Sequence, residues 1–171
     1  MCITECPESV ETRSRIGDWE ADTVIGKQGG AVLVTLAERK RRFSMIIKAE
    51  NKTAAAVSAA ITKAMAPHAA NVHTLTYDTG KEFAYHQRVC DALEAQGFFA
   101  HPYHSWERGL NQNTNGLIRQ YLPKGKSFDH LTDHEVQIIM DRLNSRPRKC
   151  LGFRTPNQVF LQDKSDVALQ T

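Results

Sequence analysis

The sequence predicts an α/β domain built on a mixed sheet, and two observations carry that prediction. Three segments near the N-terminus, 18–25, 31–38 and 42–49, have the composition of strands and are joined by short connections. After them, segments with helical spacing alternate with short apolar segments, which gives the order βββαβαβαα. Short connections join antiparallel strands, whereas strands that alternate with helices belong to parallel or mixed sheets. We therefore expect one sheet with helices packed against it.

The first strand carries the clearest pattern, because its residues alternate in character. One face holds Trp19, Ala21, Thr23 and Ile25, and the other holds Asp18, Glu20, Asp22 and Val24. A period of two gives a strand two distinct faces. A glycine-bounded turn at 26–30 and a charged turn at 39–41 connect the next two strands, so the three are expected to form an antiparallel meander.

The later helices have recognisable ends. Thr132 with Glu135, and Thr155 with Gln158, have the spacing of capping boxes and predict the starts of the last two helices. The other expected elements, in chain order, are a helix between Thr53 and Pro67, a strand at 72–77, a helix at 81–96 ended by Gly97, a strand at 98–100 and a helix at 111–122. These elements complete the βββαβαβαα order.

Length and composition indicate one globular domain. The chain has 171 residues, of which 41% are hydrophobic and 24% are charged. Residues 1–16 have no clean period and are expected to be a tail or linker, which leaves 17–171 as the domain. No stretch approaches the roughly 18 apolar residues of a membrane helix, and the N-terminus lacks the apolar run of a signal peptide. We expect a soluble, intracellular protein without a membrane partner.

The net charge of +3 is too small to indicate a nucleic-acid partner, but the charge is unevenly distributed. From Arg119 to Arg154 there are eight basic residues and four acidic ones. Such a segment either presents a basic surface to phosphates or forms an ordinary solvated face. The charge count leaves both readings open.

Cysteine and histidine spacing does not favour a zinc site. The four cysteines, Cys2, Cys6, Cys90 and Cys150, include no CxxC pair and are expected to be free thiols. Two histidine pairs have a spacing that suits a metal, namely His101 with His104 and His130 with His134. Neither pair has a matching second pair of ligands, so ordinary loop or surface histidines are expected.

Asp22 and Asp78 are the acids whose positions call for a reason. Asp22 lies within a largely apolar strand, where a carboxylate is costly unless it is paired or binds a cation. Asp78 follows the strand segment LTY, and sites gather in the loops after strands. If the two strands are neighbours, the two carboxylates converge on a metal site. The alternatives are a surface acid for Asp22 and a turn or N-cap residue for Asp78, because DTG is good turn chemistry.

Four segments resemble the catalytic core of DDE transposases of the insertion sequence 30 family. They are GDWEADTVIG, LTYDTGKEF, HPYHSWERGLNQNTNGLIRQYLPKG and LNSRPRKCLGFRTPNQVF, and they run in order from Gly17 to Phe160. The long segment from His101 to Gly125 is the most specific of the four. The resemblance implies a ribonuclease H-like fold, with a mixed five-stranded sheet flanked by helices, of the kind shared with retroviral integrases. That fold agrees with the element order expected above.

In this family three acids hold two divalent cations, Mg²⁺ or Mn²⁺, for in-line attack on a DNA phosphodiester. The resemblance implies that Asp22 is the first acid and Asp78 the second, and that both bind metal. At the third position, in NQNTNG, this chain has Gln112 where the family has Glu. Glutamine keeps the shape and a carbonyl oxygen but loses the negative charge. We therefore expect impaired catalysis, by on the order of 10²- to 10⁴-fold.

Three explanations for Gln112 remain open. The residue is an engineered exchange, or the chain is a decayed copy of a mobile element, or another acid such as Glu107 or Glu82 substitutes. Thr79 stands where the family usually has Asn, and Cys6 stands where Arg is expected, which leans toward decay.

Further residues are predicted to contact DNA through phosphates, stacking or amides. They are Lys81, Tyr103, Trp106, Asn111, Asn115, Arg119, Arg146, Arg148 and Lys149. Each has a structural alternative: Trp106 can pack against the core, an asparagine can cap the helix, and Lys81 can be an ordinary solvated lysine.

The resemblance also implies partners. We expect DNA, both element ends and target, and a homodimer or higher multimer, in the cytoplasm of a bacterium. Family members carry an N-terminal helix-turn-helix region, and too few residues precede Gly17 to form one, so sequence-specific end binding is expected to be absent. Two other functions stay open: a non-catalytic DNA-binding remnant, and a ribonuclease H-like nuclease acting on hybrids or branched DNA.

Overall fold

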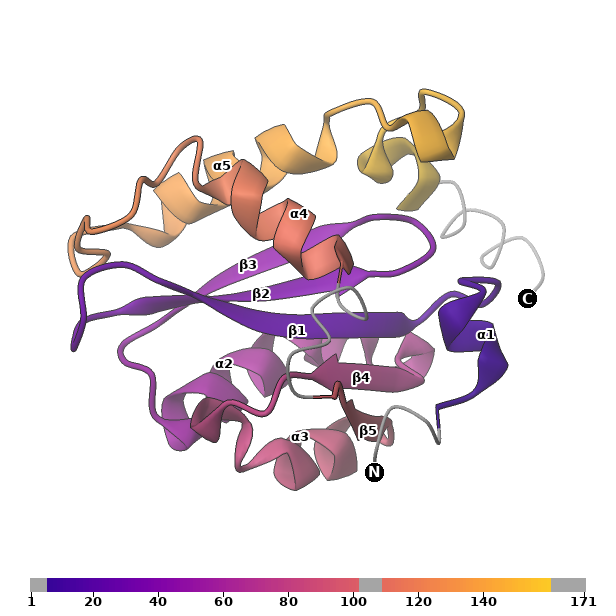
Figure 1. Cartoon of the computed structure of the whole chain (residues 1–171), viewed down its shortest axis with the longest axis horizontal. Helices are drawn as coiled ribbons and strands as arrows, with labels where there is room; N and C mark the ends of the chain where they lie inside the picture. The colour runs from indigo at the N-terminus through magenta and orange to yellow at the C-terminus, as the bar shows by residue number, and fades with distance from the viewer. Residues whose placement is uncertain (1–5, 102–108, 161–171) are drawn as a thin grey trace.

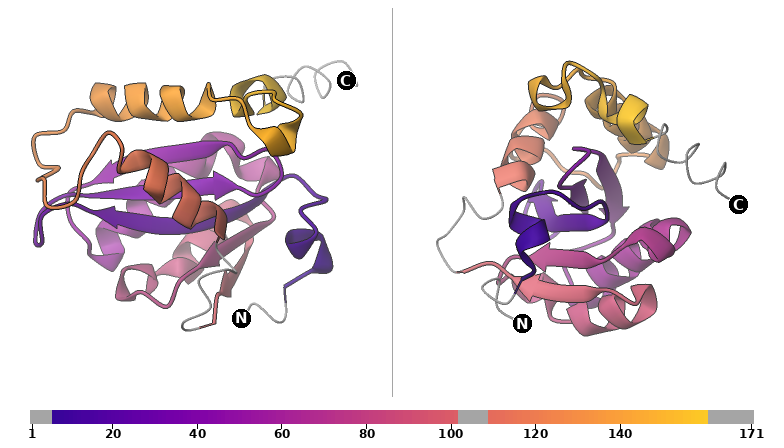
Figure 2. Two further views of the ribbon diagram at one scale, coloured as in Figure 1. Left: turned by 45° about the horizontal axis from the view of Figure 1, so that its top comes forward. Right: turned by 90° about the vertical axis from the view of Figure 1, so that its right-hand side faces the viewer.

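The computed structural model describes residues 6–101 and 109–160 and contains one five-stranded sheet in the order β3-β2-β1-β4-β5. Helices cover both faces of this sheet (Figure 1). The helices α2 and α3 lie on one face, and α4 and α5 lie on the other, as the turned views show (Figure 2). The predicted α/β domain with a mixed sheet is therefore confirmed.

The first three strands form the expected antiparallel meander. They are β1 (Asp18–Ile25), β2 (Val32–Glu38) and β3 (Ser44–Ala49). Two short strands, β4 (Thr74–Tyr77) and β5 (Gln96–Phe99), extend the sheet in parallel from β1. A helix precedes each of these two strands, as a crossover between parallel strands requires.

The α-helices after the meander are α2 (Ala54–Met65), α3 (His86–Leu93), α4 (Gly109–Ile118) and α5 (Asp133–Asn144), followed by a helical segment at 156–160. Shorter 3₁₀ segments lie at Ala66–Asn71, Lys81–Phe83 and Lys149–Leu151. Thr132 and Glu135 form the predicted capping box, and Thr155 and Gln158 exchange the same pair of contacts. Among the described residues, no helix is both long and apolar enough to cross a bilayer.

The predicted helix at 81–96 was wrong in its extent. A 3₁₀ turn at Lys81–Phe83 precedes α3, and α3 ends at Leu93, before the C-cap residue Glu94, which takes a left-handed conformation with φ of 52°. Gly97 does not end this helix but lies inside β5, where a Cβ atom would be 2.8 Å from the sulfur of Cys90. Close packing of α3 on β5, rather than helix termination, is what requires glycine there.

Two apolar clusters hold the helices on the sheet. The larger cluster joins Trp19 and Ala21 of β1 to residues of α2 and α3, with Leu75 and Tyr77 of β4 fully buried within it. The smaller cluster joins Val24 to residues of β2, β3, α4 and α5. Neither cluster includes the even-numbered acids of β1, so the middle of the α4 face is left polar.

The segment before β1 contacts the domain. It contains the short helix α1 (Glu8–Glu11), whose Val10 is buried. Lys40 Nζ donates to the carbonyl oxygen of Ser14 over 2.8 Å, and Arg15 pairs with Asp18 at 2.6 Å. These contacts fix the chain as it enters β1.

Candidate active site

Three carboxylates on one face of β1 point toward α4 and its surroundings. Asp18 pairs with Arg15 and accepts a hydrogen bond of 2.8 Å from the hydroxyl of Thr74. Glu20 accepts a hydrogen bond of 3.0 Å from the backbone N–H of Asn111, in the first turn of α4. Both acids are fully buried, whereas Asp22, the next acid on this face, is only half-buried. Asp22 is therefore the one of the three that solvent reaches.

The Asp22 carboxylate is oriented by two donors. Its Oδ1 accepts from the backbone N–H of Thr23 at 2.8 Å, and its Oδ2 accepts from Nδ2 of Asn115 at 2.9 Å. The hydroxyl of Thr35, on β2, lies 3.2 Å from Oδ1 of Asn115 and 3.3 Å from the carbonyl oxygen of Asp22. Asn115 thus ties α4 to β1 and β2 at this carboxylate.

Asp22 and Asp78 belong to neighbouring parallel strands of the sheet, Asp22 within β1 and Asp78 directly after β4. In the parallel pairing of β1 with β4, Glu20 lies opposite Thr76. Asp22 lies two residues beyond Glu20 along β1, and Asp78 lies two residues beyond Thr76, directly after the end of β4. The Asp78 carboxylate accepts a hydrogen bond of 2.9 Å from the backbone N–H of Gly80. Both acids thus follow the last paired residues at the same end of two neighbouring strands, and their convergence on one site stays a prediction.

Gly80 leaves room for two carboxylates. A Cβ atom at this position would lie 2.7 Å from Oδ1 of Asp78 and would also press on Oε2 of Glu82. Glu82 is already engaged: its Oε1 pairs with Nζ of Lys52 at 2.9 Å and accepts from Thr23 at 2.9 Å. Burial acts to raise the pKa of Glu82, but the hydrogen bonds from Lys52 and Thr23 lower it overall. Glu82 is thus held as an ionised carboxylate whose charge is balanced by Lys52. Glu107, the other acid considered as a substitute, lies outside the described residues.

Gln112 lies in α4, three residues before Asn115, and its side chain is exposed. Residues three apart on a helix are neighbours on its surface. Because Asn115 contacts Asp22, Gln112 belongs to the same side of α4. The described contact between α4 and Asp22 is made by Asn115, and Gln112 lies one helical turn before it.

The donor set suits a hard divalent cation, since Mg²⁺ and Mn²⁺ prefer carboxylate and carbonyl oxygens. Within residues 6–101 and 109–160, no group of three His, Cys, Asp or Glu side chains gathers for a metal. Asp22 and Asp78 supply two acids, and Gln112 can supply a carbonyl oxygen without charge. The residues fit a cation, with less negative charge than three acids would give.

The predicted DNA-contact residues differ in their accessibility. Lys81, Arg146 and Lys149 are exposed, whereas Tyr103 and Trp106 lie outside the described residues. Arg119 is used within the fold: its guanidinium donates to the carbonyl oxygen of Ile25 at 2.7 Å.

Asn111 and Arg148 are less accessible than expected. Asn111 belongs to α4, and its side chain is fully buried, so it does not reach DNA in this conformation. Arg148 is half-buried and donates to the carbonyl oxygen of Leu143 at 3.2 Å. Asn115 contacts Asp22 instead of standing free for a phosphate.

Sequence reasoning missed the buried charges beneath α4. Arg39 directly follows β2, and its Nε lies 3.6 Å from Oε1 of Glu20. Both side chains are almost completely buried. The alternation that singled out Asp22 also passes through Glu20, so the signal was present. The arginine partner is nineteen positions away and has no sequence pattern of its own.

Comparison with known proteins gives this arrangement a context. No protein-family model matches the chain. The transposase for insertion sequence element IS4351 of Bacteroides fragilis is 46% identical over 160 residues, which cover 94% of this chain and 49% of that protein. Transposase InsI for IS30A of Escherichia coli K12 is 35% identical over 159 residues, covering 92% and 41%. The homologues of this chain are IS30-family transposases. The chain spans about half the length of these relatives or somewhat less.

Solved structures similar to this chain share its fold. The catalytic core domain of BIV integrase matches with a TM-score of 0.64 and 16% identity, covering 89% of this chain and 98% of that one. A chain of the simian T-cell lymphotropic virus intasome, in complex with a PP2A regulatory subunit, matches with a TM-score of 0.66 and 18% identity, over 84% and 54%. The ribonuclease H-like fold expected from the sequence is thereby confirmed.

Proposed function

We propose that this chain is the catalytic core of a DDE transposase, which performs metal-dependent cleavage of DNA and transfer of the cut strand. The observation that carries the proposal is the placement of Asp22 and Asp78, each two residues beyond the last pair of the neighbouring parallel strands β1 and β4, with Asp22 bound to Asn115 of the helix that holds Gln112. The names of the homologues support the same activity.

Asp22 and Asp78 are proposed to hold Mg²⁺ or Mn²⁺, which when bound polarises the phosphodiester and favours ionisation of the attacking hydroxyl. The chain's own residues prepare the ligands. Asn115 and the N–H of Thr23 fix both oxygens of Asp22, and the N–H of Gly80 fixes one oxygen of Asp78. Side chains held in this way need little reorganisation when the cation and the DNA arrive.

Gln112 is proposed to weaken the site. An amide oxygen carries no net charge, so the pair of aspartates alone balances the cations and the phosphate. A metal clamp contributes several kcal/mol to transition-state stabilisation, and a partial loss lowers the rate by on the order of 10²- to 10⁴-fold. Rescue by Glu82 is not favoured, because that carboxylate is paired with Lys52.

DNA is the proposed partner, and a homodimer or higher multimer is the proposed working form, because strand transfer joins two element ends. The exposed Lys81 beside Asp78, together with Arg146 and Lys149, is proposed to contact the DNA backbone. Bacterial hosts of the homologues favour action in the cytoplasm.

The test is a nicking and strand-transfer assay with Mn²⁺ on duplex DNA that has a free 3′-hydroxyl end. The chain is compared with its Gln112→Glu variant, and Gln112→Glu/Asp78→Asn serves as the matched control. We expect activity in the Gln112→Glu variant alone, at least about 10²-fold above the parent chain. Activity that survives Asp78→Asn would contradict the assigned site. If the chain and its Gln112→Glu variant are both inactive but still bind DNA, the proposal is wrong. The chain is then a DNA-binding remnant without catalytic activity.

A further inference from the structure

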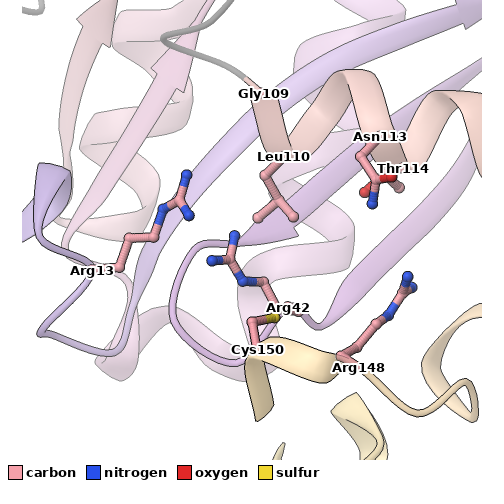
Figure 3. A pocket seen from close by; sticks show the side chains of 8 residues that line it. All are labelled: Arg13, Arg42, Gly109, Leu110, Asn113, Thr114, Arg148 and Cys150. Atoms are coloured by element: carbon pink, nitrogen blue, oxygen red, sulfur yellow. The ribbon is translucent and has the colours of Figure 1, made fainter. Parts of the chain in front are cut away.

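Three arginines from separate parts of the chain converge on the first turns of α4 (Figure 3). Arg13 precedes β1, Arg42 lies in the turn between β2 and β3, and Arg148 follows α5. They line a hollow of about 200 Å³. Its other lining residues are Gly109, Leu110, Asn113, Thr114 and Cys150.

The positive charge in this pocket is not neutralised by the described part of the chain. No ion pair there involves Arg13, Arg42 or Arg148, and the Nε atom of each is buried without a hydrogen-bond partner. A buried polar atom without a partner carries a desolvation penalty. The one hydrogen bond from these guanidinium groups within residues 6–101 and 109–160 joins Arg148 to the carbonyl oxygen of Leu143.

The arginines also repel one another. Burial lowers the pKa of Arg13, and the charges of Arg42 and Arg39 lower it further, although Glu20 acts in the opposite sense. Burial likewise lowers the pKa of Arg148, with further lowering by Arg146 and Arg42. Glu20 does not neutralise the pocket, because it already serves Arg39 and the N–H of Asn111. Like charges gathered in this way are stabilised by an anion between them.

Two of the three arginines also have strained backbones. Arg13 has φ of 54° and Arg42 has φ of 62°, in the left-handed region that residues with side chains rarely adopt. The chain therefore holds both guanidinium groups at this place despite a local conformational cost.

We propose that this pocket binds a phosphate group of the DNA backbone. Guanidinium groups present several fixed N–H donors that match the oxygens of a phosphate, and the side-chain amide of Asn113 adds a further donor. A second hollow shares Arg13, Arg42 and Cys150 with the pocket and adds Lys40 and Arg154. None of the described residues that line either hollow is acidic. A continuous basic surface of this kind fits a polyanion better than a single small anion.

The pocket is separate from the proposed catalytic site. Its assignment to DNA rests on the proposed function, in which DNA is the substrate. Leu110, Asn113 and Thr114 line it, whereas Gln112 and Asn115 lie around the helix on the other flank of α4. The phosphate bound here is therefore not the one that reacts. It fixes the DNA at a second point, on the side of α4 toward Arg42 and Arg148.

Binding of a labelled DNA duplex, in a chelator and without metal, tests the pocket independently of catalysis. The variant Arg13→Gln/Arg42→Gln keeps most of each side-chain stem and removes two charges. Arg88→Gln/Lys63→Gln, which removes two exposed charges on α3 and α2 across the sheet, is the matched control. We expect the double variant to bind about tenfold more weakly or worse, with the slope of log affinity against log salt reduced by about 1, and the control to bind like the parent.

A second arm separates DNA from free phosphate as the source of the anion. Inorganic phosphate should raise the Tm of the parent chain, as any ligand of the folded state does, and should not raise that of the double variant. A phosphate effect without any change in DNA affinity would overturn the assignment to DNA in favour of a small phosphorylated ligand. If the double variant keeps both the DNA affinity and the phosphate-induced rise in Tm, the pocket does not bind phosphate.

The single variant Arg42→Gln repeats both measurements if the double variant fails to fold by circular dichroism. Failure of strand transfer in the Gln112→Glu chain leaves this result untouched, because duplex binding is read without turnover. The two proposals therefore fail separately.

Discussion

The two faces of β1 carry opposite kinds of side chain within eight residues. On the face toward α2 and α3, Trp19 and Ala21 are buried in the larger apolar cluster. On the face toward α4, Asp18 and Glu20 are equally buried but are held by ion pairs and hydrogen bonds, and Asp22 opens to solvent.

The two faces have different roles: one stabilises the sheet, and the other fixes the position of α4. Apolar burial is non-directional, so the α2 face stabilises the sheet without specifying the position of any one atom. Buried carboxylates require donors at defined positions, so Glu20 and Asp22 fix where α4 lies on the sheet. We infer that the polar face gives up some stability to place the residues around Asp22.

The largest effect is expected where the polar face is most buried. Glu20→Gln removes the charge opposite Arg39, whose side chain is only 6% exposed. Breaking a buried ion pair from one side lowers the free energy of unfolding by about 3–5 kcal/mol. Urea denaturation of parent and variant measures the difference. A loss below about 1 kcal/mol would mean that the Glu20–Arg39 ion pair contributes little to stability.

A substitution on the apolar face should lower the free energy of unfolding almost as much, but should leave DNA binding unchanged. Leu75→Ala truncates a fully buried side chain of β4 and should lower the free energy of unfolding by about 2–5 kcal/mol. Duplex binding, measured below the new Tm, should equal that of the parent. Weakened binding in the folded variant would show that the two faces are not independent.

Asp22→Asn is the matched partner of the Glu20 exchange, two residues along the same face. Because Asp22 is half-buried, we expect the free energy of unfolding to change by less than about 1 kcal/mol. Binding of Mn²⁺ to the Gln112→Glu chain should weaken by at least about tenfold, since a ligand is lost. Calorimetric titration with Mn²⁺ decides this, and unchanged affinity would remove Asp22 from the metal site.

The smallest effect concerns the ion pair between Glu82 and Lys52. The pKa of Glu82 is lowered in the folded chain, so its contribution to stability is present above the unfolded pKa and is lost as pH falls through the folded pKa. Lys52 is 42% exposed, so solvent screening limits the contribution to about 0.2–1 kcal/mol. Urea midpoints below neutral pH should fall less steeply for Glu82→Gln than for the parent. Equal slopes would contradict the pairing.

Local patterns in the sequence predicted most of the fold. The alternation in β1 and the capping box at Thr132 depend on neighbours in the chain, and both are confirmed. The extent of α3 was wrong because Glu94 ends it in a left-handed conformation that is not evident from its residue type.

The candidate site could be predicted only in part. Asp22 and Asp78 stand out because each is an acid at a strand, and the two strands are parallel neighbours in the sheet. Arg13, Arg42 and Arg148 come from distant segments and meet only when the chain is folded, so no spacing in the sequence indicates their pocket. The assigned roles of these residues in catalysis and DNA binding stay predictions.

Gly80 shows how neighbouring charges can restrict a residue whose own backbone is ordinary. Its φ of −67° and ψ of 141° suit any amino acid, so conformation does not demand glycine there. A methyl group would nevertheless displace the carboxylates of Asp78 and Glu82 together. A side chain at position 80 therefore requires both carboxylates to move, so this position is linked to the placement of two acids on either side of it.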